Sequence, residues 1–361
     1  MWIEIDDSVS ENMESANLRQ CAVIESIALS VFHGKHVFYA KNKTLNWLCK
    51  QDIGGVSKSI FKKVSSRLSE LGSIRPNIGV RLILIFESDV FKYEDGEWII
   101  SFSFFESNQI QMGCLLAENL DDANIYLLAA KHYKINSKLK TLDINLTALG
   151  AGGSQILPSF EDAINEKNYF CLAITDTDKD YPGANSNIVS RRCNAVAQQR
   201  VWIAEHLDVP ARELENVLPL GLIADAINSD AGAVDLHERL NAVKIRIGDD
   251  LEPFLYCDLK LGTKFKLIKD ADQNKSAYWK EFVRRKNISN LMCGDECGDN
   301  CSCQMISPLS ETIANIFLEF CKKITINKQY ERVKVSENST QWLAIGKTVF
   351  DWGVALPKAR Y

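Results

Sequence analysis

Acidic residues gather directly after an apolar run in the middle of the chain. The segment FCLAITDTDKDYPG, residues 170–183, passes from apolar residues to Asp176, Asp178 and Asp180 at alternate positions. Carboxylates at this spacing repel one another unless positive charge lies among them. Hard cations such as Mg²⁺ take oxygen ligands and commonly bridge to a substrate phosphate. The chemistry that this segment suggests is therefore metal-assisted reaction at a phosphate group.

Simpler explanations compete for the same aspartates. An EF-hand calcium loop also begins D-x-D-x-D, but it needs Gly and Glu where this chain has Tyr181 and Asn187. A haloacid-dehalogenase phosphatase motif has Thr or Val at the position of Asp180. The remaining alternative is a solvated turn, because Asp, Pro and Gly all favour turns. The segment by itself leaves the turn and a cation-binding loop open.

A second acidic position strengthens the metal hypothesis. Glu118 follows another apolar run, and Asp122 comes one helical turn later. The glycine turn at residues 150–153 follows the next apolar run. Active sites of parallel sheets lie at the carboxyl ends of the strands, so we expect Glu118, Asp176 and Asp178 to converge at one edge.

Alternating strands and helices must position these residues. The patterns predict strands at residues 110–117, 141–149 and 169–175, and helices at residues 119–134, 154–168 and 187–207. Such alternation is typical of a parallel sheet. The N-terminal part predicts a mixed α+β segment, with strands at residues 36–40, 80–86 and 97–105 and a helix over residues 56–71.

The order of the motifs resembles the Toprim fold, the catalytic domain shared by topoisomerases, primases and OLD-type nucleases. Glu118 to Asp122 is similar to its E-x-x-x-D element, with Asn119 in place of the common Gly. The segment ARELEN, residues 211–216, resembles the R-E-I-E-N-Y-L signature of OLD-type and related phage-defence proteins. The segment DLKLG, residues 258–262, resembles their later D-x-K-x-G element.

The resemblance covers roughly residues 111–361, because the C-terminal run at residues 342–360 also resembles small stand-alone Toprim effectors. It implies an α/β fold with a Toprim-like parallel sheet flanked by helices. Three domains follow: an N-terminal mixed α+β domain of unknown role, a Toprim catalytic core, and a C-terminal helical extension with a Cys-rich insertion. Their expected bounds are residues 1–110, 111–270 and 271–361.

The resemblance also implies a function, namely a nuclease that cuts DNA or RNA phosphodiester bonds with two Mg²⁺ or Mn²⁺ ions. Glu118, Asp176 and Asp178 would bind the catalytic metal. Asp122 and either Glu213 or Glu215 would complete a second metal site, and Lys260 would supply positive charge in the transition state. Related effectors act in phage defence under a partner ABC-type ATPase. No ATPase motif occurs in this sequence, and a homodimer is a further expectation.

Three alternatives stay open. A rival acidic strand end lies at Glu87 and Asp89, although a turn and another strand follow it where the motif needs a helix. The second alternative is a non-catalytic Toprim-like scaffold that binds a partner protein and a structural cation. A metal-dependent phosphatase is the third. The net charge of −5 fits the scaffold better than it fits a free nuclease.

A cysteine cluster lies apart from these acidic motifs. Four of the eleven cysteines, Cys293, Cys297, Cys301 and Cys303, fall within a short stretch. Clustered cysteines in a chain without a secretory signal favour metal binding over disulfides, and four thiolates suit Zn²⁺. The spacing C-x3-C-x3-C-x-C differs from the common zinc pairs, so a surface loop of reduced thiols is the alternative.

Composition limits the class of protein. The chain has 361 residues, 46% of them hydrophobic, which is ordinary for a soluble globular protein with a sizeable core. The acidic N-terminus MWIEIDDSVSENMES is not a signal peptide and no apolar run reaches about 20 residues, so we expect a cytoplasmic protein with no membrane segment. Nucleic-acid binding would need local basic residues. The candidates are Arg191, Arg192, Arg200, Lys260, Lys264, Lys266 and residues 283–287.

Overall fold

The computed structural model describes residues 1–105, 110–229, 234–288 and 303–358. These residues form two compact units, and each is described by itself. The first unit holds Met1–Ile174, Arg192–Leu207 and Ile345–Tyr361, and the second holds Thr175–Arg191 and Asp208–Ala344. Each unit is made of segments that are separated in the sequence. The predicted domain boundaries at residues 110 and 270 therefore stay a prediction.

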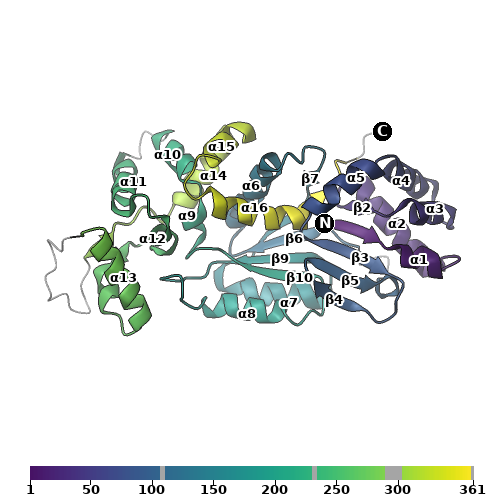
Figure 1. Cartoon of the computed structure of the whole chain (residues 1–361), viewed down its shortest axis with the longest axis horizontal. Coiled ribbons are helices and arrows are strands. Elements are labelled where there is room, and N and C mark those ends of the chain that lie inside the picture. The colour runs from purple at the N-terminus through teal and green to yellow at the C-terminus, as the bar shows by residue number, and fades with distance from the viewer. Residues whose placement is uncertain (106–109, 230–233, 289–302, 359–361) are drawn as a thin grey trace. The chain divides into compact units, whose positions relative to one another are not determined.

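The first unit begins with a five-stranded sheet in the order β2-β1-β3-β5-β4. Strand β4 is antiparallel to β5, and the other neighbours are parallel. The strands are β1 Trp2–Ile5, β2 Val37–Tyr39, β3 Arg81–Ile85, β4 Phe91–Glu94 and β5 Glu97–Ser101. The parallel neighbours β1, β2 and β3 are connected through helices, whereas β3 and β5 are connected through β4 (Figure 1). These helices are α1 Asp7–Asn12, α2 Leu18–Phe32, α3 Asn42–Lys50, α4 Gly55–Ser66 and α5 Leu68–Ile74.

A second sheet, in the order β10-β9-β6-β8, carries the acidic motifs. Strand β6 lies in the interior and is parallel to both β8 and β9. The strands are β6 Gly113–Ala117, β8 Thr147–Gly150, β9 Phe170–Thr175 and β10 Ala204–Asp208. Helices follow them along the chain: α6 Leu120–Asn136, α7 Ile156–Glu166 and α8 Ile188–Ala197. The predicted α/β class, with a parallel-rich sheet flanked by helices, is confirmed at this level.

Three predicted elements differ from the structure. The helix expected over residues 56–71 is two helices, α4 and α5, because Arg67 leaves the helical backbone conformation (φ −109°, ψ 10°). The strand expected over residues 141–149 is divided into β8 and the short β7, Asp143–Ile144, which pairs with β13, Val354–Ala355.

The third difference concerns the segment after α8. The helix expected through residue 207 ends at Ala197, and β10 follows. Arg200 takes a left-handed backbone conformation (φ 53°), which interrupts a right-handed helix. Trp202 is buried and its indole N–H donates to the carbonyl oxygen of Tyr169 at 2.6 Å, while the backbone N–H of Cys171 donates to the carbonyl oxygen of Ile203 at 3.1 Å. Burial beside β9 thus outweighs local helix propensity.

The second unit is mainly helical. Its helices are α9 Leu214–Val217, α10 Leu220–Ser229, α11 Val234–Ile247, α12 Leu251–Tyr256, α13 Gln273–Arg285, α14 Ile313–Lys323 and α15 Ile326–Val333. Helix α16, Ser339–Gly353, begins in this unit and ends in the first. A two-stranded antiparallel ladder joins β11, Thr263–Lys264, to β12, Gln304–Ile306. A 3-10 turn, Phe265–Lys269, follows β11.

Two fully buried asparagines brace the loops of this unit. The amide nitrogen of Asn216 donates to the carbonyl oxygens of Phe254 at 2.6 Å and Cys257 at 2.9 Å. Asn338 donates to the carbonyl oxygen of Leu218 at 2.7 Å and accepts from the backbone N–H of Leu220 at 3.2 Å. Buried polar groups are costly unless they are hydrogen-bonded, so these bonds specify the loop conformations. They hold the segment before residue 258 against α9.

Within the described ranges, no helix combines the length and the apolar character that crossing a membrane requires.

Candidate functional site

Glu118 lies where β6 ends, and the glycine turn after β8 encloses its backbone. The N–H groups of Gly152 and Gly153 donate to the carbonyl oxygen of Glu118 at 2.8 and 2.9 Å. Both glycines have positive φ, 80° and 63°, which other residues rarely adopt. At Gly150 a Cβ atom would lie 2.3 Å from the backbone nitrogen of Leu120, so a side chain there would clash with the backbone. The structure therefore brings together the acidic strand end and the glycine turn.

Asn119, which replaces the glycine of the E-x-x-x-D pattern, caps the helix that follows. Its side-chain oxygen accepts from the backbone N–H of Asp122 at 3.0 Å, as an N-cap residue does. Asp122 itself lies in the first turn of α6, where a negative charge interacts favourably with the helix dipole. Asp122 therefore has a structural role that is independent of metal binding.

The aspartates after β9 lie in a tightly held loop. The N–H groups of Thr177 and Asp178 donate to the carbonyl oxygen of Arg212 at 3.0 and 2.9 Å. The side-chain amide of Asn187 donates to the backbone oxygen of Asp176 at 3.0 Å and to the carboxylate of Asp178 at 2.8 Å. The carboxylate of Asp176 accepts from the N–H of Leu214 at 2.9 Å. Asp178 is exposed and has a left-handed backbone (φ 54°), so its carboxylate is open to solvent.

A buried charge cluster, the Lys260 cluster, consists of Glu213, Glu215 and Lys260. The Lys260 Nζ lies 3.0 Å from Glu213 Oε2 and 3.2 Å from Glu215 Oε1. Both glutamates are more than nine-tenths buried. Oε2 of Glu215 accepts no hydrogen bond from any residue in the described ranges. One ammonium group thus serves two buried carboxylates and leaves a buried oxygen without a donor.

The charges of this cluster perturb one another. Burial raises the pKa of the Glu215 carboxyl, and the nearby Lys260 ammonium opposes that effect. Burial alone would lower the pKa of Lys260, but Glu215 and Glu213 outweigh it, so the pKa of Lys260 is raised. Lys260 is therefore a fixed positive charge. It was expected to face the substrate, and in the structure it neutralises the glutamates expected to bind metal.

Asp180 and Arg212 organise a second cluster, which sequence reasoning missed. This Arg212 network consists of Asp180, Arg212, Asp258, Asp270 and Lys275. Asp180 accepts from Arg212 and, at 2.9 Å, from Lys275, and Lys275 also lies 3.1 Å from Asp270. Arg212 lies 3.7 Å from Asp258 and 3.1 Å from Glu213. Asp180, which the alternative of a solvated turn would leave exposed without partners, is thus an ion-pair partner.

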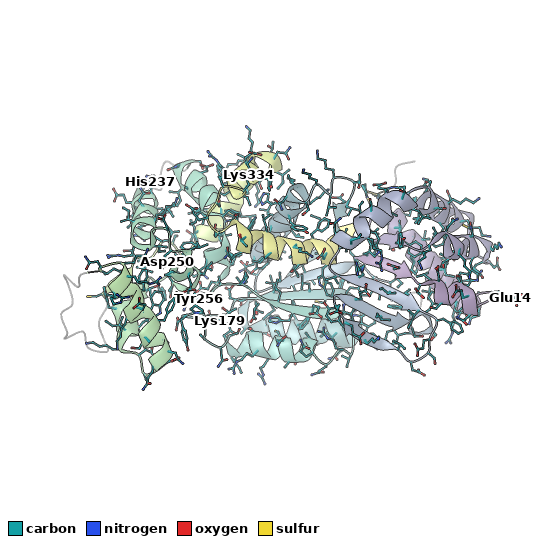
Figure 2. All side chains as sticks on the ribbon, in the orientation of Figure 1. Glu14, Lys179, His237, Asp250, Tyr256 and Lys334 are labelled. Atoms are coloured by element: carbon teal, nitrogen blue, oxygen red, sulfur yellow. The ribbon has the colours of Figure 1, made fainter. Side chains whose placement is uncertain are left out.

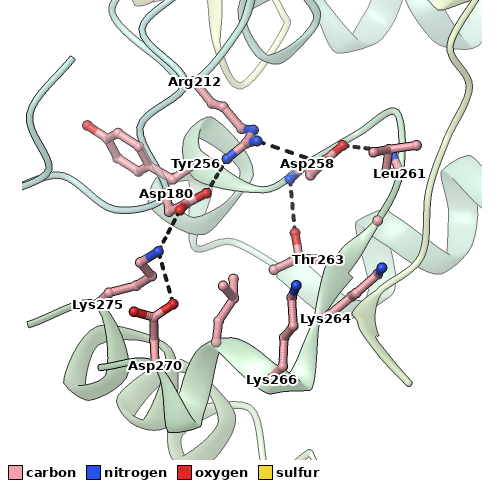
Figure 3. A pocket seen from close by; sticks show the side chains of 12 residues that line it. Asp180, Arg212, Tyr256, Asp258, Leu261, Thr263, Lys264, Lys266, Asp270 and Lys275 are labelled. Carbon is pink, nitrogen blue, oxygen red and sulfur yellow. Dashed lines mark hydrogen bonds and ion pairs between the residues drawn. The ribbon is translucent and has the colours of Figure 1, made fainter. Parts of the chain in front are cut away.

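The network borders a pocket of about 300 Å³ within the second unit (Figure 3). Its lining includes Asp180, Arg212, Tyr256, Asp258, Lys264, Lys266, Asp270 and Lys275. Tyr256, at the end of α12, is also labelled among the side chains of the whole chain in Figure 2. Of the basic residues proposed from the sequence, Lys264 and Lys266 line this pocket. Arg200 does not, because its guanidinium pairs with Glu205 and stacks 4.4 Å from the Tyr93 ring centroid.

The predicted metal ligands are divided between the units. Glu118 and Asp122 belong to the first unit, and Asp176, Asp178 and Glu215 belong to the second. In the part of the chain that the structure describes, no three His, Cys, Asp or Glu side chains form a ready metal-binding group. Carboxylate oxygens are the ligand type that a hard cation takes, and Oε2 of Glu215 in the second unit has no hydrogen-bond donor among the described residues.

The proposed zinc ligands Cys293, Cys297 and Cys301 lie outside the described residues. Cys303 lies just before β12, and its carbonyl oxygen accepts from the N–H of Phe265 at 3.0 Å. The backbone of Cys303 therefore lies beside Phe265, the residue that directly follows β11. The zinc site and the Cys-rich insertion remain predictions.

Comparisons with known proteins add no assignment. No protein-family model, no curated protein and no solved structure matches this chain.

Proposed function

We propose that the chain is a metal-dependent nuclease of the Toprim type that cuts DNA or RNA phosphodiester bonds. One observation carries the proposal: Glu118 and Asp176 directly follow the carboxyl ends of neighbouring parallel strands, β6 and β9, which pair in register from Gly113 with Phe170 to Leu116 with Ala173. Ligands of open parallel sheets bind at that edge. The glycine turn beside Glu118 supports the proposal as a second feature of the same edge.

In this proposal the carboxylates hold one or two Mg²⁺ or Mn²⁺ ions. Glu118, Asp176 and Asp178 serve one metal, and Asp122 and Glu215 complete or orient another. When bound, such ions activate water and stabilise the leaving oxygen of a phosphodiester. The residues of the chain hold this arrangement: Asn187 orients the carboxylate of Asp178, and the backbone oxygen of Arg212 fixes the D-x-D loop. Lys260 supplies fixed positive charge beside Glu215, the residue proposed for the second metal.

The wider biological role is part of the same proposal. The chain would act in the cytoplasm as a phage-defence effector, as a homodimer, and under the control of an ABC-type ATPase supplied by another chain. Zn²⁺ on the cysteine cluster would stabilise the fold and take no part in cleavage.

The first test is cleavage of DNA and RNA by the purified chain with Mg²⁺ and with EDTA. Glu118→Gln and Asp176→Asn keep side-chain shape and remove charge, so each should lower the cleavage rate by at least about 100-fold. Glu161→Gln is the matched control, because Glu161 is an exposed carboxylate on α7 of the first unit. Cleavage that persists in EDTA, or that is normal in both site variants, would refute the proposal.

A second function is favoured by the Lys260 cluster. Because Lys260 already neutralises Glu213 and Glu215, the chain could serve as a non-catalytic scaffold that binds a partner and a structural cation. A rise in melting temperature with Mg²⁺, without cleavage of any nucleic acid in cell extract, would support the scaffold. Hydrolysis of a chromogenic phosphate monoester would instead support the phosphatase alternative.

A further inference from the structure

The pocket beside the Arg212 network carries more positive than negative charge. Four cationic side chains, Arg212, Lys264, Lys266 and Lys275, line it together with three carboxylates, those of Asp180, Asp258 and Asp270. This excess of one positive charge is opposite in sign to the net charge of the chain, which is −5. The volume of the pocket, about 300 Å³, lies at the lower end of the range for ligand sites.

The excess charge is localised on Lys264 and Lys266. Arg212 and Lys275 occupy the three carboxylates, because Asp180 pairs with both, Asp270 pairs with Lys275, and Asp258 lies 3.7 Å from Arg212. Lys264 and Lys266 form no ion pair among the residues that the structure describes, although the charge of Lys266 helps to lower the pKa of Asp270. Figure 3 draws no dashed line from the ammonium group of Lys264 or of Lys266 to any of the residues shown. Two ammonium groups are therefore available to a ligand.

The turn at residues 258–262 separates Lys260, which reaches the Lys260 cluster, from the two lysines that line the pocket. The carboxylate of Asp258 accepts from the N–H groups of Lys260 at 3.0 Å and Leu261 at 2.7 Å, which fixes the turn. Gly262 completes it with φ 81°, and a Cβ there would lie 2.9 Å from the Cδ atom of Pro308. Before this glycine, Lys260 reaches Glu213 and Glu215. After it, the lysines of β11 and the following turn line the pocket.

Arg212 connects the two sides. Its guanidinium lies 3.1 Å from Glu213, which belongs to the Lys260 cluster, and it also pairs with Asp180 on the wall of the pocket. A ligand that extends from the cluster to the pocket would pass this side chain. A nucleic-acid strand has this form, because its phosphates repeat along the backbone at regular spacing.

We propose that Lys264 and Lys266 bind a backbone phosphate of a nucleic-acid strand next to the phosphate held at the candidate catalytic residues. This inference rests on the proposed function and names its substrate subsite. Lysine is a suitable ligand because it acts as a mobile point charge for phosphate. Tyr256 and Leu267 line the same pocket and offer an apolar wall against which a sugar or base packs.

The test is equilibrium binding in EDTA, where metal-dependent cleavage is absent. Fluorescent single strands of DNA and RNA, about 12 nucleotides long, fit the site size expected for such surfaces. For Lys264→Gln/Lys266→Gln we expect roughly tenfold weaker binding and a salt slope that falls by about 0.7 for each phosphate that is no longer neutralised. Lys266→Gln alone, at an exposed position, should show part of this weakening and guards against misfolding.

The matched control is Lys280→Gln/Lys328→Gln, which removes two exposed lysines of the same unit outside the pocket. The control should bind like the unmodified chain. Equal affinity and equal salt slope in the pocket variant and the control would overturn the inference. So would a chain that binds AMP or inorganic phosphate through these lysines but binds strands no more tightly than those small anions.

Cleavage with Mg²⁺ separates this inference from the proposed function. If strands bind through Lys264 and Lys266 but are not cut, the subsite stands and the nuclease proposal fails. If strands are cut while the pocket variant binds and cuts normally, the nuclease proposal stands and the subsite fails.

Discussion

The two charged clusters of the second unit differ in how fully their carboxylates are paired with cations and hydrogen-bond donors. In the Arg212 network each of the three aspartates faces at least one cation, and Asp180 faces two. In the Lys260 cluster one ammonium lies between two buried glutamates, and Oε2 of Glu215 has no hydrogen-bond donor among the described residues. A buried acceptor without a donor costs about 1–3 kcal/mol. The network is therefore complete, whereas the cluster is a place where a bound cation would lower the free energy.

Replacing the lysine of the incomplete cluster should have the largest effect. Lys260→Met would leave Glu215 buried without a cation, and Glu213 would keep only Arg212. Breaking a buried pair costs about 3–5 kcal/mol, and because the Lys260 side chain is 34% exposed we expect about 2–3 kcal/mol. Urea unfolding in EDTA measures this decrease in stability.

Divalent cations should then distinguish the variant from the unmodified chain. Millimolar Mg²⁺ should raise the melting temperature of Lys260→Met more than that of the unmodified chain, because the position of the ammonium becomes open to the metal. Adding Glu215→Gln should restore stability without metal, since it removes the carboxylate charge that lost its cation. An unchanged stability of Lys260→Met, with no response to Mg²⁺, would remove the difference between the two clusters.

A smaller effect is expected when the complete network is broken. Asp180→Asn removes the carboxylate that Arg212 and Lys275 share, and both cations are more than four-fifths buried by side-chain area. The expected destabilisation lies between that of a surface pair and that of a buried pair, at about 1–2 kcal/mol. Unlike the effect at Lys260, it should not be reversed by Mg²⁺.

The control for this second prediction is Asp235→Asn. Asp235 pairs with Arg239 one helical turn away, and its side chain is 69% exposed. Its replacement should change the free energy of unfolding by less than about 0.5 kcal/mol. If Asp180→Asn behaved like this control, the network would not stabilise the fold.

The contrast between the clusters also explains which parts of the molecule can be predicted from sequence. Strands β6 and β9 are continuous apolar runs, α6 begins after a polar N-cap residue, and the glycine turn carries its own backbone signal. These features depend on residues close together in the chain, so local patterns predict them. The α/β class and the position of Glu118 beside the glycine turn were predicted correctly for this reason.

Features that depend on distant residues were not predicted. Strand β10 exists because Trp202 and Ile203 are buried next to β9, although the local pattern favours a helix. The Arg212 network joins loops more than 30 positions apart, and its only sequence signal was the arginine before Glu213. Asp180 was interpreted from its neighbours Pro182 and Gly183 as part of a turn, because nothing nearby indicates Arg212 or Lys275. Charge pairing across loops requires the tertiary structure.

The smallest expected effect is on the pH dependence of the stability that Asp270 contributes to the Arg212 network. The backbone N–H of Asp272 donates to Asp270 at 3.0 Å, and together with the Lys275 ammonium it lowers the pKa of Asp270. A carboxyl with a lowered pKa in the folded state stabilises the fold above the unfolded pKa of about 4 and loses that contribution as the pH falls further. Asp270→Asn should therefore reduce stability by less than about 1 kcal/mol at pH 7.

At lower pH the difference between Asp270→Asn and the unmodified chain should shrink, and it should vanish below the folded pKa of Asp270, where both side chains are uncharged. Urea unfolding at pH 7, pH 5 and pH 3 measures the trend, with Asp249→Asn as a control at an exposed position. A difference that stays constant with pH would mean that the ion pair with Lys275 does not stabilise the wall of the pocket.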